Sequence, residues 1–266
     1  MSDGTAVIYV YDGSFDGLMC CVAKSLRSRE RPEAIILQDE AQESLFPTVT
    51  IDTDSVLSKK VTGFIRERIG VRSLEFIKRV YLTNMERREN AILDFVAKSL
   101  ECGKSLLGAL VSEDVLPMIK AVRRLNNEAE LLKGFIRFSD MGGVLVSVIK
   151  PDNRVLPLLA RHFCDRFPDG RVVIYDEGHG EILACGEGEI RLGFADGLTL
   201  PPASAEEKKY RALWQSFYET AAVKERYNPK CRSSRMPKRY REYMTEFKER
   251  ESYAPQPGLP GAAPSG

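Results

Sequence analysis

The sequence lacks the features of membrane-spanning and secreted chains. No apolar run approaches the roughly 18 residues that a transmembrane helix needs. The N-terminal stretch MSDGTAVIYVYDG has no basic region followed by an apolar one, so it does not predict a signal peptide. We therefore expect a cytoplasmic protein with no membrane partner.

Cysteine and histidine are scarce and poorly spaced for binding metals. The 6 cysteines form no C-x-x-C pair and no C-x-x-x-C-x-x-C run, and only 2 histidines are present. A zinc site needs spaced pairs of such residues, and an iron–sulfur cluster needs several thiolates. We therefore expect no metal and no cofactor. The thiols are expected to be reduced and idle: Cys20, Cys21, Cys102, Cys164, Cys185 and Cys231.

The composition is that of an ordinary globular protein, but the charge is unevenly distributed. Apolar residues make up 43% of the 266 residues, charged residues 29%, and the net charge is +1. Residues 1–60 contain 6 basic and 10 acidic side chains, whereas residues 224–241 contain 8 basic side chains and one acidic one. The neutral average therefore conceals a basic C-terminal segment.

Hydrophobic periodicity predicts an α/β (α+β) fold with an N-terminal β-α-β segment over 1–52. Apolar runs at 6–11 and 34–38 predict parallel strands joined by a helix that Ser14 caps. TVTID at 48–52 is a further short strand. A helical segment follows over 53–132, in which apolar residues recur every three or four positions and Gly103 marks a stop.

Residues 133–195 predict a β-β-α-β-β segment. FIRF (135–138) and VLVSVI (144–149) are expected to form an antiparallel hairpin, followed by a helix that Asp152 caps. A second hairpin pairs residues 172–175 with 181–185, and a further strand at 189–194 is an open alternative.

The C-terminal part predicts basic helices over 204–250 and a disordered tail over 251–266. Ser204 and Glu207 form a capping box, and Pro237 suits the first position of a second helix. One apolar stripe has the spacing of a core-facing helix: Tyr210, Leu213, Trp214, Phe217 and Ala221. We expect all segments over 5–250 to form one compact domain.

Basic residues near aromatic ones suggest binding to a polyanion. The segment 224–241 interleaves its cations with Tyr227 and Tyr240, although a solvated basic face is an alternative. His162 and Arg166, four residues apart on a helix, could share a phosphate. The predicted nucleic-acid-binding residues are Lys133, Arg137, Arg154, Arg166, Lys230, Arg232, Arg235, Lys238, Arg239 and Tyr240.

Catalytic candidates are fewer and carry no specific motif. The turn DGSFDG after the first strand lacks both common phosphate-binding glycine patterns, but Asp12 and Asp16 are able to act as carboxylates or metal ligands there. Asp152 and His162 complete the set of candidates. We expect His179, between two glycines, to be exposed and idle.

Five stretches resemble a bacterial family of uncharacterised proteins linked to DNA metabolism or DNA repair. They are YDGSFDGLMCCV (11–22), KGFIRF (133–138), PDNRVLPLLARHFCDRFPDGRVVIYDEGHGE (151–181), YRALWQSFYETAAVKERYNP (210–229) and MPKRYREYM (236–244). The resemblance implies a radical SAM protein as partner, and some relatives are fused to a uracil-DNA glycosylase-like domain. It implies no particular reaction and no catalytic residue.

Three hypotheses follow. The first is a DNA-binding accessory protein whose radical SAM partner performs the chemistry. The second is a DNA-processing enzyme, a nuclease or glycosylase using Asp12, Asp152 or His162, which requires its candidate groups to share one cleft. The third is a protein-interaction scaffold, which predicts an exposed apolar patch on the helices of 55–131 and no cationic groove.

Overall fold

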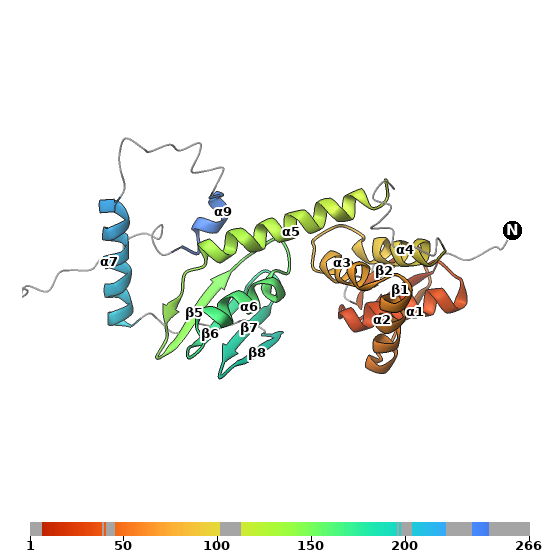
Figure 1. Cartoon of the computed structure of the whole chain (residues 1–266), viewed down its shortest axis with the longest axis horizontal. Coiled ribbons are helices and arrows are strands. Elements are labelled where there is room, and N and C mark those ends of the chain that lie inside the picture. The colour runs from red at the N-terminus through yellow and green to blue at the C-terminus, as the bar shows by residue number, and fades with distance from the viewer. Residues whose placement is uncertain are drawn as a thin grey trace, which may run out of the picture. The chain divides into compact units, whose positions relative to one another are not determined.

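The computed structural model describes residues 7–38, 40, 46–101, 113–195, 197, 204–221 and 236–244. It has a mixed α/β fold, as predicted, with two separate sheets (Figure 1). The chain divides into two compact units. Unit 1 comprises Met1–Glu128 with Asp152–Arg154, and unit 2 comprises Ala129–Pro151 with Val155–Gly266. No helix among the described residues is long and apolar enough to span a bilayer.

Unit 1 begins with the predicted parallel β-α-β arrangement. β1 (Ile8–Tyr11) is buried along its whole length, as expected for a strand of branched and aromatic residues in a parallel sheet. α1 (Phe15–Ser28) begins after Ser14, whose hydroxyl accepts a hydrogen bond from the Gly17 N–H at 2.9 Å. β2 (Ala34–Leu37) and β3 (Thr48–Thr50) flank β1 in the order β2-β1-β3.

Helices form the rest of unit 1. They are α2 (Ser55–Arg68), α3 (Val71–Tyr81), α4 (Arg88–Glu101) and the first part of α5 (Leu116–Phe135). Their apolar stripes face one core, in which Ile65, Ile77 and Phe95 are almost completely buried. Burying each such side chain contributes about 1.5–3 kcal/mol. The predicted stop at Gly103 lies outside the described residues.

The prediction that Asp152 caps a helix is wrong. α6 (Leu156–Arg166) begins after Val155, where Pro157 fits the first turn. Asp152 instead donates its N–H to the Glu128 carboxylate at 3.0 Å. Asn153 donates both its backbone N–H and its side-chain amide to the same carboxylate, at 3.0 and 2.6 Å. These bonds satisfy a glutamate that is buried in unit 1.

Unit 2 contains a five-stranded sheet in the order β4-β5-β6-β7-β8. β5 (Val144–Ile149) and β6 (Arg171–Asp176) are parallel because α6 connects them, whereas β7 (Glu181–Gly186) and β8 (Glu189–Phe194) continue as antiparallel hairpins. The optional strand at 189–194 is therefore present. Figure 1 shows α6 lying across β6 and β7.

The expected strand FIRF is not a strand. Phe135 ends α5, and the Phe138 ring packs on Phe163 and Phe167 at centroid distances of 5.4 and 5.5 Å. The strand that pairs with β5 is β4 (Ser139–Asp140), which reaches only Leu145 and Val146. The aromatic side chains are held by helix packing, and residues 147–149 of β5 remain outside the β4 ladder.

Two of the thiols expected to be idle form a disulfide. Cys164 on α6 and Cys185 on β7 are bonded, with their Cα atoms 5.5 Å apart. The packing of α6 across the sheet brings them together from positions 21 residues apart, which sequence spacing does not reveal. Cys20 and Cys21 are free and buried, and burial together with Cys20 raises the pKa of the Cys21 thiol to about 12.

The apolar stripe of the next helix does not face a core among the described residues. α7 (Ala205–Ala221) starts after Ser204, whose hydroxyl accepts from the Glu207 N–H, which is one of the two hydrogen bonds of the predicted capping box. The buried Glu207 carboxylate accepts from Arg211 at 2.9 Å and from the Asp140 N–H at 3.1 Å, so polar contacts attach the helix to β4. The expected core residues are 41–61% exposed: Tyr210, Leu213, Trp214 and Phe217.

The last described element is the short helix α9 (Lys238–Arg241). Pro237 precedes it as its cap residue, one position earlier than predicted. Tyr240 and Met244 are buried. The remainder of the basic segment, residues 224–235, and the tail over 251–266 lie outside the described residues.

Candidate nucleic-acid interface

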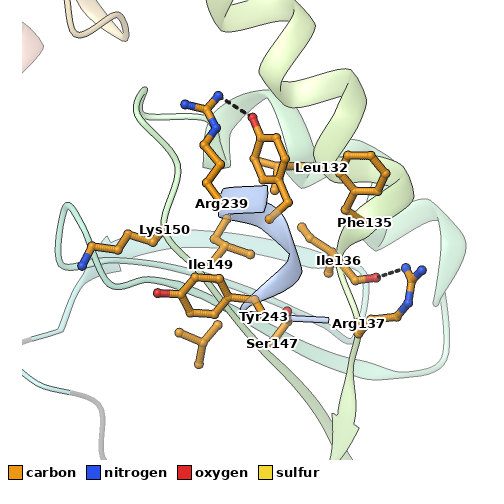
Figure 2. Close-up of a pocket in the computed structure, with 11 residues that line it drawn as sticks. Leu132, Phe135, Ile136, Arg137, Ser147, Ile149, Lys150, Arg239 and Tyr243 are labelled. Atoms are coloured by element: carbon orange, nitrogen blue, oxygen red, sulfur yellow. Dashed lines mark hydrogen bonds between the residues drawn. The ribbon is translucent and has the colours of Figure 1, made fainter. Parts of the chain in front are cut away.

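A pocket in unit 2 collects cations and aromatic rings from three separate parts of the chain. The end of α5 supplies Phe135 and Arg137, the end of β5 supplies Lys150, and α9 with the residues after it supplies Arg239, Tyr240 and Tyr243. Figure 2 shows Lys150 and Tyr243 on one side of the pocket and Arg137 on the other. The pocket follows the part of β5 that β4 does not pair with.

The pocket is a surface groove rather than an enclosed chamber. It has about 290 Å³ of empty space, which includes the part open to solvent. The space that the centre of a water molecule can occupy in it is only about 10 Å³, which is room for about one water molecule. An extracted base would need a closed pocket of its own size. This geometry therefore favours contact with a backbone over excision of a base.

Two tilted aromatic rings and an arginine form one wall. The Tyr240 ring lies 5.5 Å from the Phe135 ring, centroid to centroid. The Arg239 guanidinium lies 4.8 Å above the centre of the Tyr240 ring and donates a hydrogen bond to its hydroxyl at 2.6 Å (Figure 2). An arginine stacked on an aromatic ring presents a flat cationic surface, which suits both phosphates and bases.

The other two cations lie on the α5 and β5 sides. Arg137 donates to the carbonyl oxygens of Gly134 and Ile136 at 2.8 and 3.2 Å, which holds its guanidinium at the end of α5. The Lys150 side chain is exposed and forms no ion pair within the described part of the chain. Lys133 lies one turn earlier on α5 and pairs with Glu130 at 2.6 Å.

A turn after β6 lies beside the pocket. The Tyr243 hydroxyl donates to the Glu177 carboxylate at 2.9 Å. Burial and this carboxylate raise the pKa of Tyr243, so its phenol stays protonated at neutral pH. Asp176 is completely buried and accepts a hydrogen bond from His179 Nδ1 at 2.7 Å. His179 is therefore half-buried and hydrogen-bonded, contrary to the prediction that it is exposed and idle.

The pocket brings together three of the predicted nucleic-acid-binding residues: Arg137, Arg239 and Tyr240. Lys133 lies nearby on α5, and Lys238 is exposed at the start of α9. The Arg166 guanidinium on α6 lies over the Phe167 ring. Arg154 belongs to unit 1, where it donates to the Tyr81 hydroxyl at 3.3 Å. The remaining predicted residues lie outside the described residues: Lys230, Arg232 and Arg235.

The acidic turn after β1 is a tightly bonded local structure. Asp12 accepts from the Ser14 N–H and hydroxyl at 2.9 and 2.7 Å and from the Thr53 hydroxyl at 2.8 Å. Partial burial opposes ionisation of Asp12, but these hydrogen bonds outweigh it and lower the pKa of its carboxyl. Asp16 accepts from the Ser58 hydroxyl at 2.6 Å. Both carboxylates therefore accept hydrogen bonds from neighbouring residues of unit 1.

The candidate catalytic groups belong to different units. Asp12, Asp16 and Asp152 lie in unit 1, and His162 lies in unit 2. His162 packs edge-on against Phe163, and its Nε2 is buried with no hydrogen-bond partner among the residues that the structure describes. Within the described residues, no group of three or more histidine, cysteine, aspartate or glutamate side chains is placed to hold a metal ion.

Unit 1 has a pocket of its own, with about 780 Å³ of empty space including the part open to solvent, between β2 and the loop before α4. Acidic and basic side chains lie together in this loop and at the start of α4: Glu86, Arg87, Arg88 and Glu89. Arg88 pairs with Glu89 at 2.9 Å, and Arg87 pairs with Glu33 at 3.5 Å. This mixed charge gives the pocket no preference for a polyanion, unlike the pocket of unit 2.

Sequence reasoning missed Lys150, Tyr243 and the Asp176–His179 pair. Lys150 is a single cation at the end of an apolar strand, and only the parallel pairing of β5 with β6 places it beside the turn after β6. The DEGHG string at 176–180 was the available signal. An aspartate three residues before a histidine in a tight turn is within hydrogen-bonding reach of it.

These features define a two-unit α/β protein with a cationic, aromatic-walled groove in its second unit. The family model DUF4130, a domain of unknown function, matches residues 86–246. The match spans more than half of the 266 residues, so the chain belongs to this family. Neither the curated proteins nor the solved structures gave a match.

Proposed function

We propose that this chain is a DNA-binding protein of DNA metabolism or repair, and that the unit 2 pocket contacts the DNA backbone. One observation carries the proposal. Arg137, Lys150 and Arg239, from three separate segments, line a pocket with one aromatic wall, in which Phe135 packs at a tilt against the buried Tyr240. Cations that track phosphates beside rings that stack on bases are the two components of single-strand binding surfaces.

The local charges favour a polyanion over an internal role for these side chains. The exposed Lys150 forms no ion pair within the described residues, so a phosphate can approach it without displacing a carboxylate. Arg239 donates a hydrogen bond to the Tyr240 hydroxyl, which holds its guanidinium at the pocket.

Fluorescence anisotropy of a labelled single-stranded DNA, lacking terminal phosphates, tests the proposal with the full chain. Affinity should fall steeply between about 50 and 200 mM salt, because each neutralised phosphate releases counterions. Lys150→Ala and Arg239→Ala should each weaken binding and reduce the log–log salt slope by about 0.7.

Arg161→Ala is the matched control, because it removes the same charge from a side chain on α6 that is 91% exposed. This variant should bind like the wild type. Absence of wild-type binding, or an equal loss in all three variants, would show that the pocket is not the binding site.

We further propose that a radical SAM protein performs the chemistry on the bound DNA. This part depends on the family resemblance carried by the stretches at 11–22, 151–181 and 210–229. A pulldown of that partner with and without DNA distinguishes a DNA-dependent complex from direct protein contact. Capture that is independent of DNA, together with no oligonucleotide binding, would favour a scaffold instead.

A further inference from the structure

The turn after β6 contains a buried carboxylate that holds a histidine ring. Asp176 is 0% exposed, and its Oδ1 accepts from the N–H groups of Gly178 and His179 at 3.0 and 3.2 Å. Its Oδ2 accepts from His179 Nδ1 at 2.7 Å. A carboxylate bonded in this way is acceptor-only, so Nδ1 carries the proton and the ring is fixed in orientation.

This arrangement leaves Nε2 of His179 available to a ligand. The side chain is 23% exposed, and no hydrogen bond to Nε2 is found within the described part of the chain. The other histidine differs, because Nε2 of His162 is buried. A protonated imidazole donates from both nitrogens, so His179 can donate to Asp176 and to an external anion at once.

The turn lies at the rim of the unit 2 pocket by two independent contacts. Tyr243, which lines the pocket, donates to Glu177 in the turn at 2.9 Å. A Cβ on Gly178 would lie 3.5 Å from Lys150 Cγ and 3.4 Å from Asp176 Oδ1. The aliphatic part of Lys150 and the Asp176 carboxylate that holds His179 therefore both lie next to Gly178. The missing side chain of Gly178 leaves room for both.

We infer that Lys150 and His179 together bind one phosphate of a nucleic-acid backbone, with Asp176 as the residue that positions the imidazole. The inference rests on the proposed function, because it names a specific contact within that binding surface. Lys150 supplies a mobile cation and His179 a fixed donor. A fixed donor loses less conformational freedom on binding than a second lysine would.

Charged groups around the turn set the conditions for this contact. Glu177 is exposed beside His179 and opposes a phosphate, although Tyr243 occupies one of its oxygens. Glu181 lies opposite Asp176 in the β6–β7 register. Lysine, glutamate and tyrosine side chains and backbone phosphodiesters ordinarily keep their charge state between pH 6 and 8, whereas histidine is the side-chain type that ordinarily changes its charge in this interval.

The test measures oligonucleotide affinity at about pH 6 and pH 8 with the same unphosphorylated strand, so that no terminal phosphate titrates. Wild-type affinity should be about tenfold higher at the lower pH, as expected for one charge-assisted hydrogen bond. His179→Gln should abolish this difference while retaining binding at pH 8. His162→Gln, at the second histidine, should retain the full pH effect.

Two further variants test the arrangement around the ring. Asp176→Asn should reduce the pH effect, and the imidazole NMR signals of His179 should shift on adding the oligonucleotide in the wild type only. Glu177→Gln, which keeps an acceptor for Tyr243, should raise affinity at both pH values. Should Asp176→Asn not fold, His179→Gln and Glu177→Gln still decide the question.

The outcomes separate this inference from the proposed function. Salt-dependent binding that is lost in Lys150→Ala but unchanged in His179→Gln at both pH values overturns the inference and leaves the proposed function standing. Absence of any wild-type binding overturns both. A pH effect that persists in His179→Gln and disappears in His162→Gln would show that His162 causes the effect. This result also overturns the inference.

Discussion

At the scale of single residues, local hydrogen-bonding rules predicted well where partners lie close in sequence. Ser14 and Ser204 both cap helices as expected, because a cap is decided within four residues. His179 was misjudged because glycines on both sides suggest an idle turn. The decisive group, Asp176, is buried only because β6 is an inner strand of its sheet. Burial of that kind is a tertiary property.

Gly17 illustrates a residue whose identity depends on the turn packed against it. It lies in the first turn of α1, and a Cβ there would lie 2.3 Å from Asp12 Oδ1 and 2.7 Å from Thr53 Oγ1. The Asp12 carboxylate accepts hydrogen bonds from the Ser14 and Thr53 hydroxyls. Neither Asp12 nor Thr53 can therefore move aside without breaking the bonds that close the turn. Glycine is therefore required for space at this position.

Gly17→Ala should destabilise the protein by about 1–3 kcal/mol, as expected for overpacking, although alanine is ordinarily the better helix former. Gly63 on α2 is the control, because a Cβ there meets nothing within 4 Å. Gly63→Ala should stabilise by about 0.5–1 kcal/mol. Urea unfolding followed by circular dichroism measures both. Stabilisation by Gly17→Ala would show that the turn yields freely.

At the scale of elements, the sequence predicted most helices and strands but misplaced two apolar surfaces. The buried runs of β1 and β5 and the stripes of the unit 1 helices are periodic signals that burial confirms. FIRF has an equally apolar pattern, yet the end of α5 extends into it. The stripe of α7 has helical spacing and is exposed. Periodicity identifies an amphipathic element but does not identify what covers it.

The Cys164–Cys185 disulfide is an element-scale feature that the spacing of the cysteines does not predict. It joins α6 to β7 and closes a loop between residues 21 positions apart. A covalent loop of this length restricts the unfolded chain and is worth about 3 kcal/mol in the chain-entropy treatment. The bond should therefore be a main contributor to the stability of unit 2.

Reductant should lower the stability of wild-type unit 2 by about 3 kcal/mol and should not affect Cys164→Ser. Trp214, the only tryptophan in the chain, lies in unit 2 and reports its urea unfolding by fluorescence. Cys164→Ser should already unfold at the lower urea concentration of the reduced wild type. A wild-type curve that reductant leaves unchanged would mean that the bond contributes nothing.

At the scale of the whole molecule, the proposed binding surface and the acidic turn occupy different compact units. The pocket residues and the Asp176–His179 pair lie in unit 2, whereas Asp12, Asp16 and Arg154 lie in unit 1. Segments predicted in chain order could not show this division. Residues 152–154 belong to unit 1, although the residues before and after them in the chain belong to unit 2. Only long-range contacts, such as those of Glu128 with Asn153, place that short segment.

Separate cores predict separate responses to substitutions in each unit. Gly17→Ala should change the circular dichroism transition of unit 1 while leaving the Trp214 fluorescence transition in place. Reduction of the Cys164–Cys185 bond should do the reverse. In Gly17→Ala under reducing conditions, each transition should show only the loss of its own unit, within about 0.5 kcal/mol of the value for the single change, as for sites with no shared partner. The opposite result would be that the circular dichroism and fluorescence transitions coincide and that Gly17→Ala and reduction shift both equally. It would mean that the two units, which share α5, unfold as one cooperative structure.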